Sequence, residues 1–81
     1  MDVTLAFLES LIAFPRSDQR RFVKAARLLN ENEKHPSLRV HELSADMAGL
    51  WSASASDELR IIFVRTAAGG KTLLRCTRHY R

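Results

Sequence analysis

The fold of this chain is decided by the stretch LRIIFVR-TAAGG-KTLLRCT, residues 59–77. Residues 59–65 are rich in β-branched and aromatic side chains, which favours a strand, and residues 71–77 form a second run of similar kind. Gly69 and Gly70 lie between the two runs and allow the tight reversal that an antiparallel hairpin needs. This stretch therefore predicts two neighbouring antiparallel strands.

Two more strands are predicted just upstream. Residues 39–43 form a short alternating run, and residues 50–55 alternate Trp51 and Ala53 with Ser52 and Ser54. Residues 56–58, Ser-Asp-Glu, form a turn before the hairpin. The second half of the chain thus predicts an antiparallel sheet of about four strands.

The alternation of side chains along a strand assigns the two faces of this sheet. We expect one face to be apolar and covered, and the other to be uncovered, although a register slip of one residue would reverse the faces. The covered face would carry Trp51, Ala53, Leu59, Ile61 and Phe63, and the uncovered face Ser52, Ser54 and Arg60.

The first half of the chain predicts two amphipathic helices. Thr4 is a candidate cap for the first helix and Pro15 marks its end, and Ser17 with Asp18 reads as the start of the second. A polar stretch ending at Pro36 stops the second helix. The expected buried faces are Leu5, Leu8, Leu11 and Ile12 in the first helix and Phe22, Ala25, Ala26 and Leu29 in the second. We therefore expect an α+β domain over residues 1–81, with both helices on one face of the sheet.

Composition and charge narrow the class of protein. The 81 residues carry a net charge of +4, and residues 60–81 hold six Lys or Arg with no Asp or Glu, which favours a polyanionic partner or an acidic protein. A solvated basic edge is the plainer alternative. No apolar run is long enough to cross a bilayer. The single Cys76 excludes an internal disulfide and fits a reducing compartment, so we expect a cytoplasmic protein.

The chain ends in a chemically dense tail, Cys76-Thr77-Arg78-His79-Tyr80-Arg81. Histidine transfers protons near neutral pH, arginine binds phosphate with two hydrogen bonds, and tyrosine stacks on bases. Cleavage of RNA by its own 2′-hydroxyl needs proton transfer and charge neutralisation, and needs no metal or cofactor. The alternative is a frayed terminus without a chemical role. A zinc site built from His35, His41, Cys76 and His79 is disfavoured because these residues lack paired ligand spacing.

Three segments follow one another in a characteristic order: Gly49-Leu50-Trp51-Ser52, Asp57-Glu58-Leu59-Arg60-Ile61-Ile62-Phe63 and Leu73-Leu74-Arg75-Cys76-Thr77-Arg78-His79-Tyr80. Together they resemble the YoeB branch of the RelE/ParE toxin superfamily, and the resemblance covers roughly residues 17–80. A further segment, residues 35–43 with the sequence HPSLRVHEL, is similar to one found in RelE-like plasmid-stabilisation proteins.

The resemblance implies the toxin of a type II toxin–antitoxin system, which cleaves messenger RNA on the ribosome and is neutralised by a cognate antitoxin. It implies that Arg60 stabilises the phosphate, that His79 is the general acid and that Tyr80 orients the substrate. The general base is left open between His41 and Glu42, because an ungapped match favours the first and residue chemistry the second. The further RNA contacts that we expect are Arg39, Arg75, Arg78 and Arg81.

A departure from the family at the N-terminus keeps other functions open. The chain enters a helix almost at once, where most relatives begin with a strand, so that at most residues 2–5 can pair with the sheet. A bare edge of this kind would suit an antitoxin segment or a second copy of the chain. The alternatives are a ParE-like inhibitor of DNA gyrase and an inactive binding module with the same fold.

Overall fold

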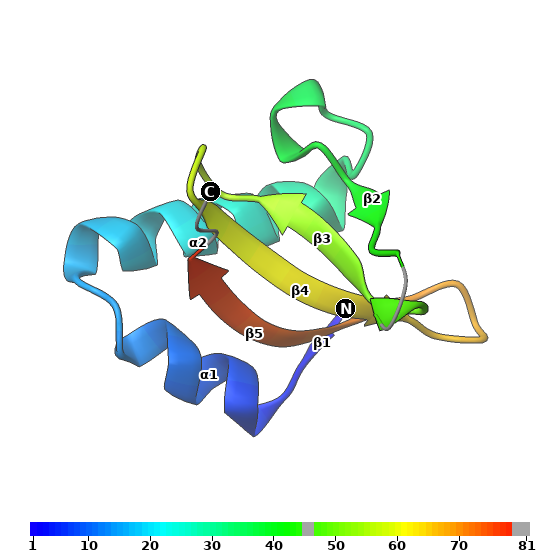
Figure 1. Ribbon diagram of the computed structural model, residues 1–81, viewed down its shortest axis with the longest axis horizontal. Coiled ribbons are helices and arrows are strands. Elements are labelled where there is room, and N and C mark those ends of the chain that lie inside the picture. The colour runs from blue at the N-terminus through cyan, green and yellow to red at the C-terminus, as the bar shows by residue number, and fades with distance from the viewer. Residues whose placement is uncertain (45–46, 79–81) are drawn as a thin grey trace.

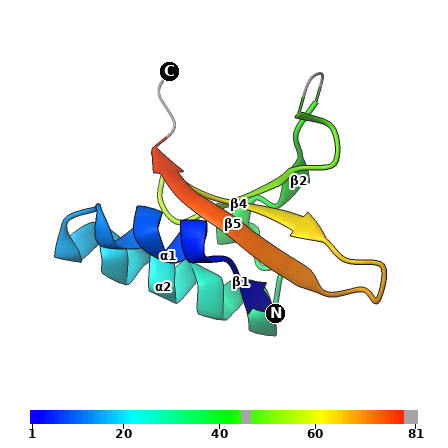
Figure 2. The ribbon, with the colours of Figure 1, turned by 90° about the horizontal axis from the view of Figure 1, so that it is seen from below.

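The computed structural model describes residues 1–44 and 47–78. Its sheet has the strand order β1-β5-β4-β3-β2 (Figure 1). Both long helices lie side by side on one face of this sheet (Figure 2), which confirms the predicted α+β class. The elements are β1 (Asp2–Val3), α1 (Leu5–Ile12), α2 (Arg16–Glu31), the short 3-10 helix η1 (Pro36–Leu38), β2 (His41–Glu42), β3 (Trp51–Ser54), β4 (Leu59–Arg65) and β5 (Lys71–Arg78).

The hairpin of β4 and β5 is antiparallel, as predicted. Its turn is closed by hydrogen bonds from the Thr66 N–H to the Gly70 carbonyl at 2.9 Å and from the Gly69 N–H to the Thr66 carbonyl at 3.0 Å. Gly69 has a φ of 85°, a conformation that L side chains rarely adopt. The paired glycines therefore determine where the chain reverses.

The expected count of four strands is one too few, because β1 adds a fifth. It pairs in parallel with β5, so the sheet is not wholly antiparallel. The Thr4 hydroxyl, immediately after β1, donates to the Leu73 carbonyl at 3.0 Å and accepts the Phe7 N–H at 3.0 Å, so it caps α1 as predicted and also binds the sheet. The sequence allowed residues 2–5 to pair with the sheet, but a strand of two residues is too short to show an alternating pattern, so it was not counted as a strand.

The core lies between α2 and the face of the sheet that was predicted to be covered. Leu59, Ile61 and Phe63 are buried there, and Phe22 and Leu29 of α2 are fully buried against them. Helix α2 begins at Arg16 and not at Ser17, since Pro15 occupies the N-cap position and its fixed φ suits the helix entry. The apolar pattern of α2 and β4 was therefore sufficient to place the core.

The predicted buried face of α1 is wrong except at Leu11, which is partly buried against the core. Leu5 and Ile12 are 73% and 71% exposed, whereas Phe7 is buried. Helix α1 packs mainly on β5 near the sheet edge, and the Ser10 hydroxyl accepts the Cys76 N–H at 2.8 Å. A helix in this position covers only a narrow stripe, so most of its apolar residues remain outside.

Strand β5 contains a bulge opposite Ile62 and Phe63. Ile62 pairs with Arg75 and Phe63 with Leu73, so one extra residue of β5 is accommodated. As a result Leu73 and Cys76 are both buried on the helix side although they are three residues apart. Arg75 is consequently turned to the face without helices. No helix in the described residues is long and apolar enough to cross a membrane.

Candidate functional site

The helix-free face brings residues from four strands into two adjacent rows. The register aligns His41 with Ser52, Ser52 with Ile62, and Ile62 with Arg75. The next row aligns Ser54 with Arg60 and Arg60 with Thr77. Except for Ser54, these residues line one cavity of about 510 Å³.

Arg60 is a half-buried cation of this cavity. Its Nη1 donates to the Ser56 carbonyl at 2.6 Å and to the Leu59 carbonyl at 3.0 Å, which holds the guanidinium against the β3–β4 turn. Within residues 1–44 and 47–78 it forms no ion pair with a carboxylate. Its charge is therefore not neutralised by the described part of the chain, and its other N–H groups can bind an anion.

Arg75 adds a second cation to the same face. It is exposed, lines the cavity, and its side chain forms no hydrogen bond or ion pair with the described residues. Arg60 and Arg75 occupy adjacent rows of β4 and β5. Two unpaired guanidiniums around one cavity form a suitable site for phosphate groups.

His41 and Glu42 lie on opposite faces of the sheet, because successive residues of β2 alternate between the two faces. His41 pairs with Ser52 on the cavity face and lines the cavity, whereas Glu42 pairs with Trp51, whose strand position belongs to the helix side. The His41 Nδ1 lies 2.8 Å from the Arg39 carbonyl, and a carbonyl only accepts, so Nδ1 carries the hydrogen. In the neutral ring Nε2 is then the free acceptor, which is the state that a general base needs.

The other candidate base, Glu42, has a local partner. Its Oε2 accepts the Gly49 N–H at 3.2 Å, across the turn that joins β2 to β3. The carboxylate thus holds the turn and does not line the cavity of His41 and Arg60.

Arg78, which the sequence offered as a phosphate contact, has carboxylate partners in the structure. It pairs with Leu59 on the helix side of the sheet. Its Nη2 lies 3.1 Å from Asp18 of α2 and its Nη1 lies 3.1 Å from Glu58. Although Arg78 borders the cavity, its charge is engaged by two carboxylates, and it joins the end of β5 to α2 and to the β3–β4 turn.

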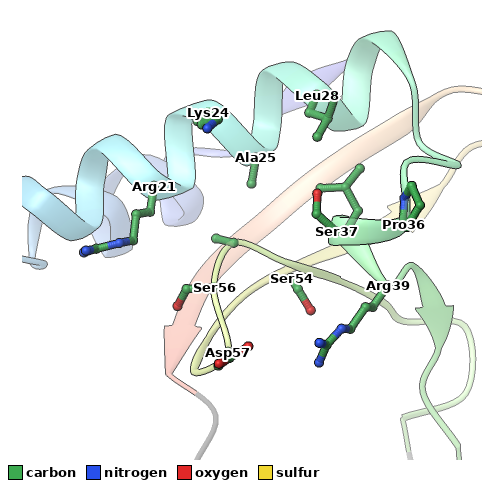
Figure 3. Close-up of a pocket in the computed structure, with 12 residues that line it drawn as sticks. Arg21, Lys24, Ala25, Leu28, Pro36, Ser37, Arg39, Ser54, Ser56 and Asp57 are labelled. Carbon is green, nitrogen blue, oxygen red and sulfur yellow. The ribbon is translucent and has the colours of Figure 1, made fainter.

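Arg39 lies at another cavity, of about 600 Å³, between α2, η1 and the end of β3 (Figure 3). It has a φ of 46° and ends η1. Lys24 and Arg21 of α2 line the opposite side of this cavity, whereas Asp57 of the β3–β4 turn lies on the same side as Arg39. The structure therefore brings together His41, Arg60 and Arg75, and it places the Arg39 side chain apart from them.

Three predicted residues, His79, Tyr80 and Arg81, lie outside the described residues. Sequence reasoning also missed part of the cavity. Leu43, Leu50 and Ile62 form an apolar side, and Thr77 lies beside Arg60. The alternation of Arg75 with Thr77 along β5 could have indicated Thr77. Residues 43 and 50 come together only through the β2–β3 hairpin, whose register the sequence left open.

No protein-family model matches the sequence, and no curated protein is significantly similar to it. Solved structures are similar. A YoeB/ParE toxin from Agrobacterium tumefaciens has a TM-score of 0.73 at 20% identity, covering 99% of this chain and 100% of that chain. YafQ from E. coli has a TM-score of 0.77 at 15% identity, covering 95% and 89%. The archaeal RelE–RelB complex from Pyrococcus horikoshii contains a chain with a TM-score of 0.73 at 19% identity, covering 99% and 93%. The chain therefore has the RelE/ParE toxin fold, with YoeB among its structural neighbours, as its sequence resemblance predicted.

Proposed function

We propose that this chain is the toxin of a type II toxin–antitoxin system and that it cleaves messenger RNA on the ribosome, in the cytoplasm. The observation that carries the proposal is the convergence of His41, Arg60 and Arg75 around one cavity on the helix-free face of this fold. Attack of a 2′-hydroxyl on the adjacent phosphate requires removal of a proton and stabilisation of negative charge. His41 at one end of the cavity can accept the proton, and the two arginines, which form no ion pair with the described residues, can stabilise the charge.

His41 is the proposed general base. The Arg39 carbonyl fixes the proton on Nδ1, and Nε2 is then able to take the proton of the 2′-hydroxyl. We therefore propose His41, and not Glu42, from the two residues that the sequence offered. Glu42 instead acts on the turn through Gly49.

Arg60 and Arg75 supply the charge. As the 2′-oxygen attacks, negative charge grows on the phosphoryl oxygens, and a guanidinium that is already held in place stabilises it without reorganisation. Arg60 is held by two backbone carbonyls, so we assign it to the reacting phosphate. The exposed Arg75 is assigned to a neighbouring phosphate of the chain.

The resemblance supplies the two remaining roles. His79 is the proposed acid, which protonates the leaving 5′-oxygen, and Tyr80 is proposed to orient the substrate. Both follow Arg78, whose contacts with Asp18 and Glu58 fix the end of β5.

A cognate antitoxin is the proposed protein partner. A structural neighbour from Staphylococcus aureus, the YoeB–YefM heterotetramer, is a toxin–antitoxin complex. Apolar side chains exposed along α1, among them Leu5, Leu8 and Ile12, give a partner protein surface to bury. We expect a small neighbouring reading frame to encode the antitoxin.

The proposal is tested with the purified chain, ribosomes programmed with a defined message, and primer extension. We expect cleavage within the message only when ribosomes are present. His41→Ala and Arg60→Ala should each lower the single-turnover rate about 100-fold or more. Glu42→Gln distinguishes the two candidate bases, because it should lower the rate much less than His41→Ala.

Arg20→Ala is the matched control for Arg60→Ala, since Arg20 is an exposed arginine on α2. It should cleave like the unmodified chain. Intact messages combined with inhibition of gyrase supercoiling would instead identify a ParE-like poison. Absence of both activities would leave an inactive module, and either result refutes the proposed nuclease.

A further inference from the structure

The cavity that holds the catalytic candidates has an apolar side that the proposed chemistry does not use. Leu43 and Leu50 extend the β2–β3 pairing, joined by a hydrogen bond from the Leu43 N–H to the Leu50 carbonyl at 2.8 Å. Ile62 lies on the same face of β4. Aliphatic side chains have no role in moving protons or neutralising phosphate, so they need another explanation.

Ser52 lies at the floor of this cavity, between His41 and Ile62 in the same row. Only 3% of Ser52 is exposed, and its hydroxyl forms no hydrogen bond with the described residues. No side-chain oxygen of the described residues is both enclosed and unpaired, so the Ser52 hydroxyl oxygen is open to the cavity, where it can bond to water or to a ligand atom. Ser52 therefore gives the apolar side one polar contact.

The distances along the strands suit a nucleotide. Two residues of a strand advance about 7 Å, which separates the Arg60 row from the Ile62 row and the Ile62 row from the level of Leu50. A ligand that places its phosphate on Arg60 thus reaches Ser52 and then the leucines with its next group. A ligand that matches these contacts is anionic at one end and apolar at the other.

We propose that Leu43, Leu50 and Ile62, with the Ser52 hydroxyl, form a nucleobase pocket that sets the base preference next to the scissile phosphate. Bases that leave the stack are held in other enzymes between apolar side chains, with hydrogen bonds to the base edge. This inference rests on the proposed function, since it names the part of the RNA that the same cavity recognises.

Glu42 supports the pocket as a positioning residue. Its carboxylate accepts the Gly49 N–H, and Gly49 precedes Leu50 with a φ of 90°. The contact therefore fixes the turn from which the apolar wall is presented. Glu42→Gln should keep the base preference because an amide oxygen also accepts, whereas Glu42→Ala should weaken it.

The experiment measures binding without cleavage. The chain is labelled at its Leu and Ile methyl groups and titrated with each of the four nucleoside monophosphates and with ribose 5-phosphate, which lacks a base. We expect at least one nucleotide to bind about tenfold more tightly than ribose 5-phosphate, with shifts of the Leu43, Leu50 and Ile62 methyl signals. Arg60→Ala should weaken both kinds of ligand.

Leu50→Ala and Ser52→Ala should remove most of the difference between nucleotide and ribose 5-phosphate, and Ser52→Ala should also change the order of the four bases. Leu5→Ala is the control, because Leu5 is exposed on α1 on the other face. Equal binding of ribose 5-phosphate and all nucleotides, without methyl shifts, overturns the pocket even if the message is cleaved on the ribosome. Selective binding with no cleavage upholds the pocket while the nuclease proposal fails.

Discussion

Glu33 is the carboxylate most strongly affected by its surroundings, and replacing it tests how the sheet is tied to the helices. Its two oxygens accept hydrogen bonds from Arg65 of β4 at 3.1 and 2.6 Å, and Lys71 of β5 lies 3.1 Å away. The Arg65 guanidinium also lies 4.2 Å from the centre of the Trp51 ring. These contacts join the segment after α2 to three strands.

The magnitude follows from the pKa of the Glu33 carboxyl. Hydrogen bonding by Arg65, assisted by Lys71 and opposed by desolvation, lowers this pKa from near 4.5 to about 2. At about 1.4 kcal/mol per pH unit, the lowered pKa corresponds to about 3 kcal/mol. Because the side chain is 29% exposed, solvent screens the pair, and we expect about 1 to 2 kcal/mol.

The sign of the pH dependence is fixed by the lowered pKa. The stabilisation is complete above the unfolded value near 4.5 and is lost as pH falls toward the folded value of about 2. Glu33→Gln should therefore lower the free energy of unfolding by about 1 to 2 kcal/mol at pH 7, and this difference should largely vanish by about pH 2.5.

The assay is urea unfolding followed by circular dichroism across this pH range. Glu31→Gln is the control, because Glu31 is an exposed residue at the end of α2 that forms no ion pair within the described residues. A Glu33→Gln difference that stays constant from pH 7 to pH 2.5, or that matches Glu31→Gln, would refute the assigned network.

Three further predictions concern the core, the thiol and the basic face. Phe22→Ala should lower the free energy of unfolding by about 3 to 5 kcal/mol in urea, because Phe22 is fully buried. Cys76 should react with a thiol reagent only slowly until the chain is unfolded, since burial raises its pKa to about 11; rapid native-state labelling would contradict this. Arg75→Ala should reduce the slope of log K for RNA binding against log salt concentration by about 1, which corresponds to the loss of about one phosphate contact. Arg78→Ala should mainly lower stability, by about 1 kcal/mol, as its ion pairs are lost, and the opposite ranking of the two arginines in RNA binding would disprove their assignment.

Long, strongly patterned elements could be predicted from the sequence. Residues 59–65 carry the alternation of β4 without error, and Phe22, Ala25 and Leu29 lie on the buried face of α2 as expected. In both cases the apolar period equals the period of the element and the element is covered along its length. The α1 prediction failed because an eight-residue helix beside one strand is covered only at Phe7 and its neighbours.

The candidate site was harder to predict because its residues depend on register between segments. His41 and Glu42 are adjacent, and either could serve as a base by its chemistry alone. Only the pairing of His41 with Ser52 assigns the two residues to different faces. This pairing depends on the β2–β3 turn and on the burial of Ala53, and residues 41 and 42 alone determine neither of them.

The bulge in β5 likewise decides on which face of the sheet the charge of Arg75 lies. With strict alternation from the buried Leu73, Arg75 would point to the helix side and Cys76 to the open face. One extra residue at Leu74 reverses both, so that Cys76 is buried and Arg75 is exposed beside Arg60. The Thr4 hydroxyl contacts the carbonyls of Leu73 and Leu74 at 3.0 and 3.2 Å, within this irregularity. The short N-terminal segment, where the sequence departs from the family, thus helps to hold the strand geometry that turns Arg75 toward the cavity.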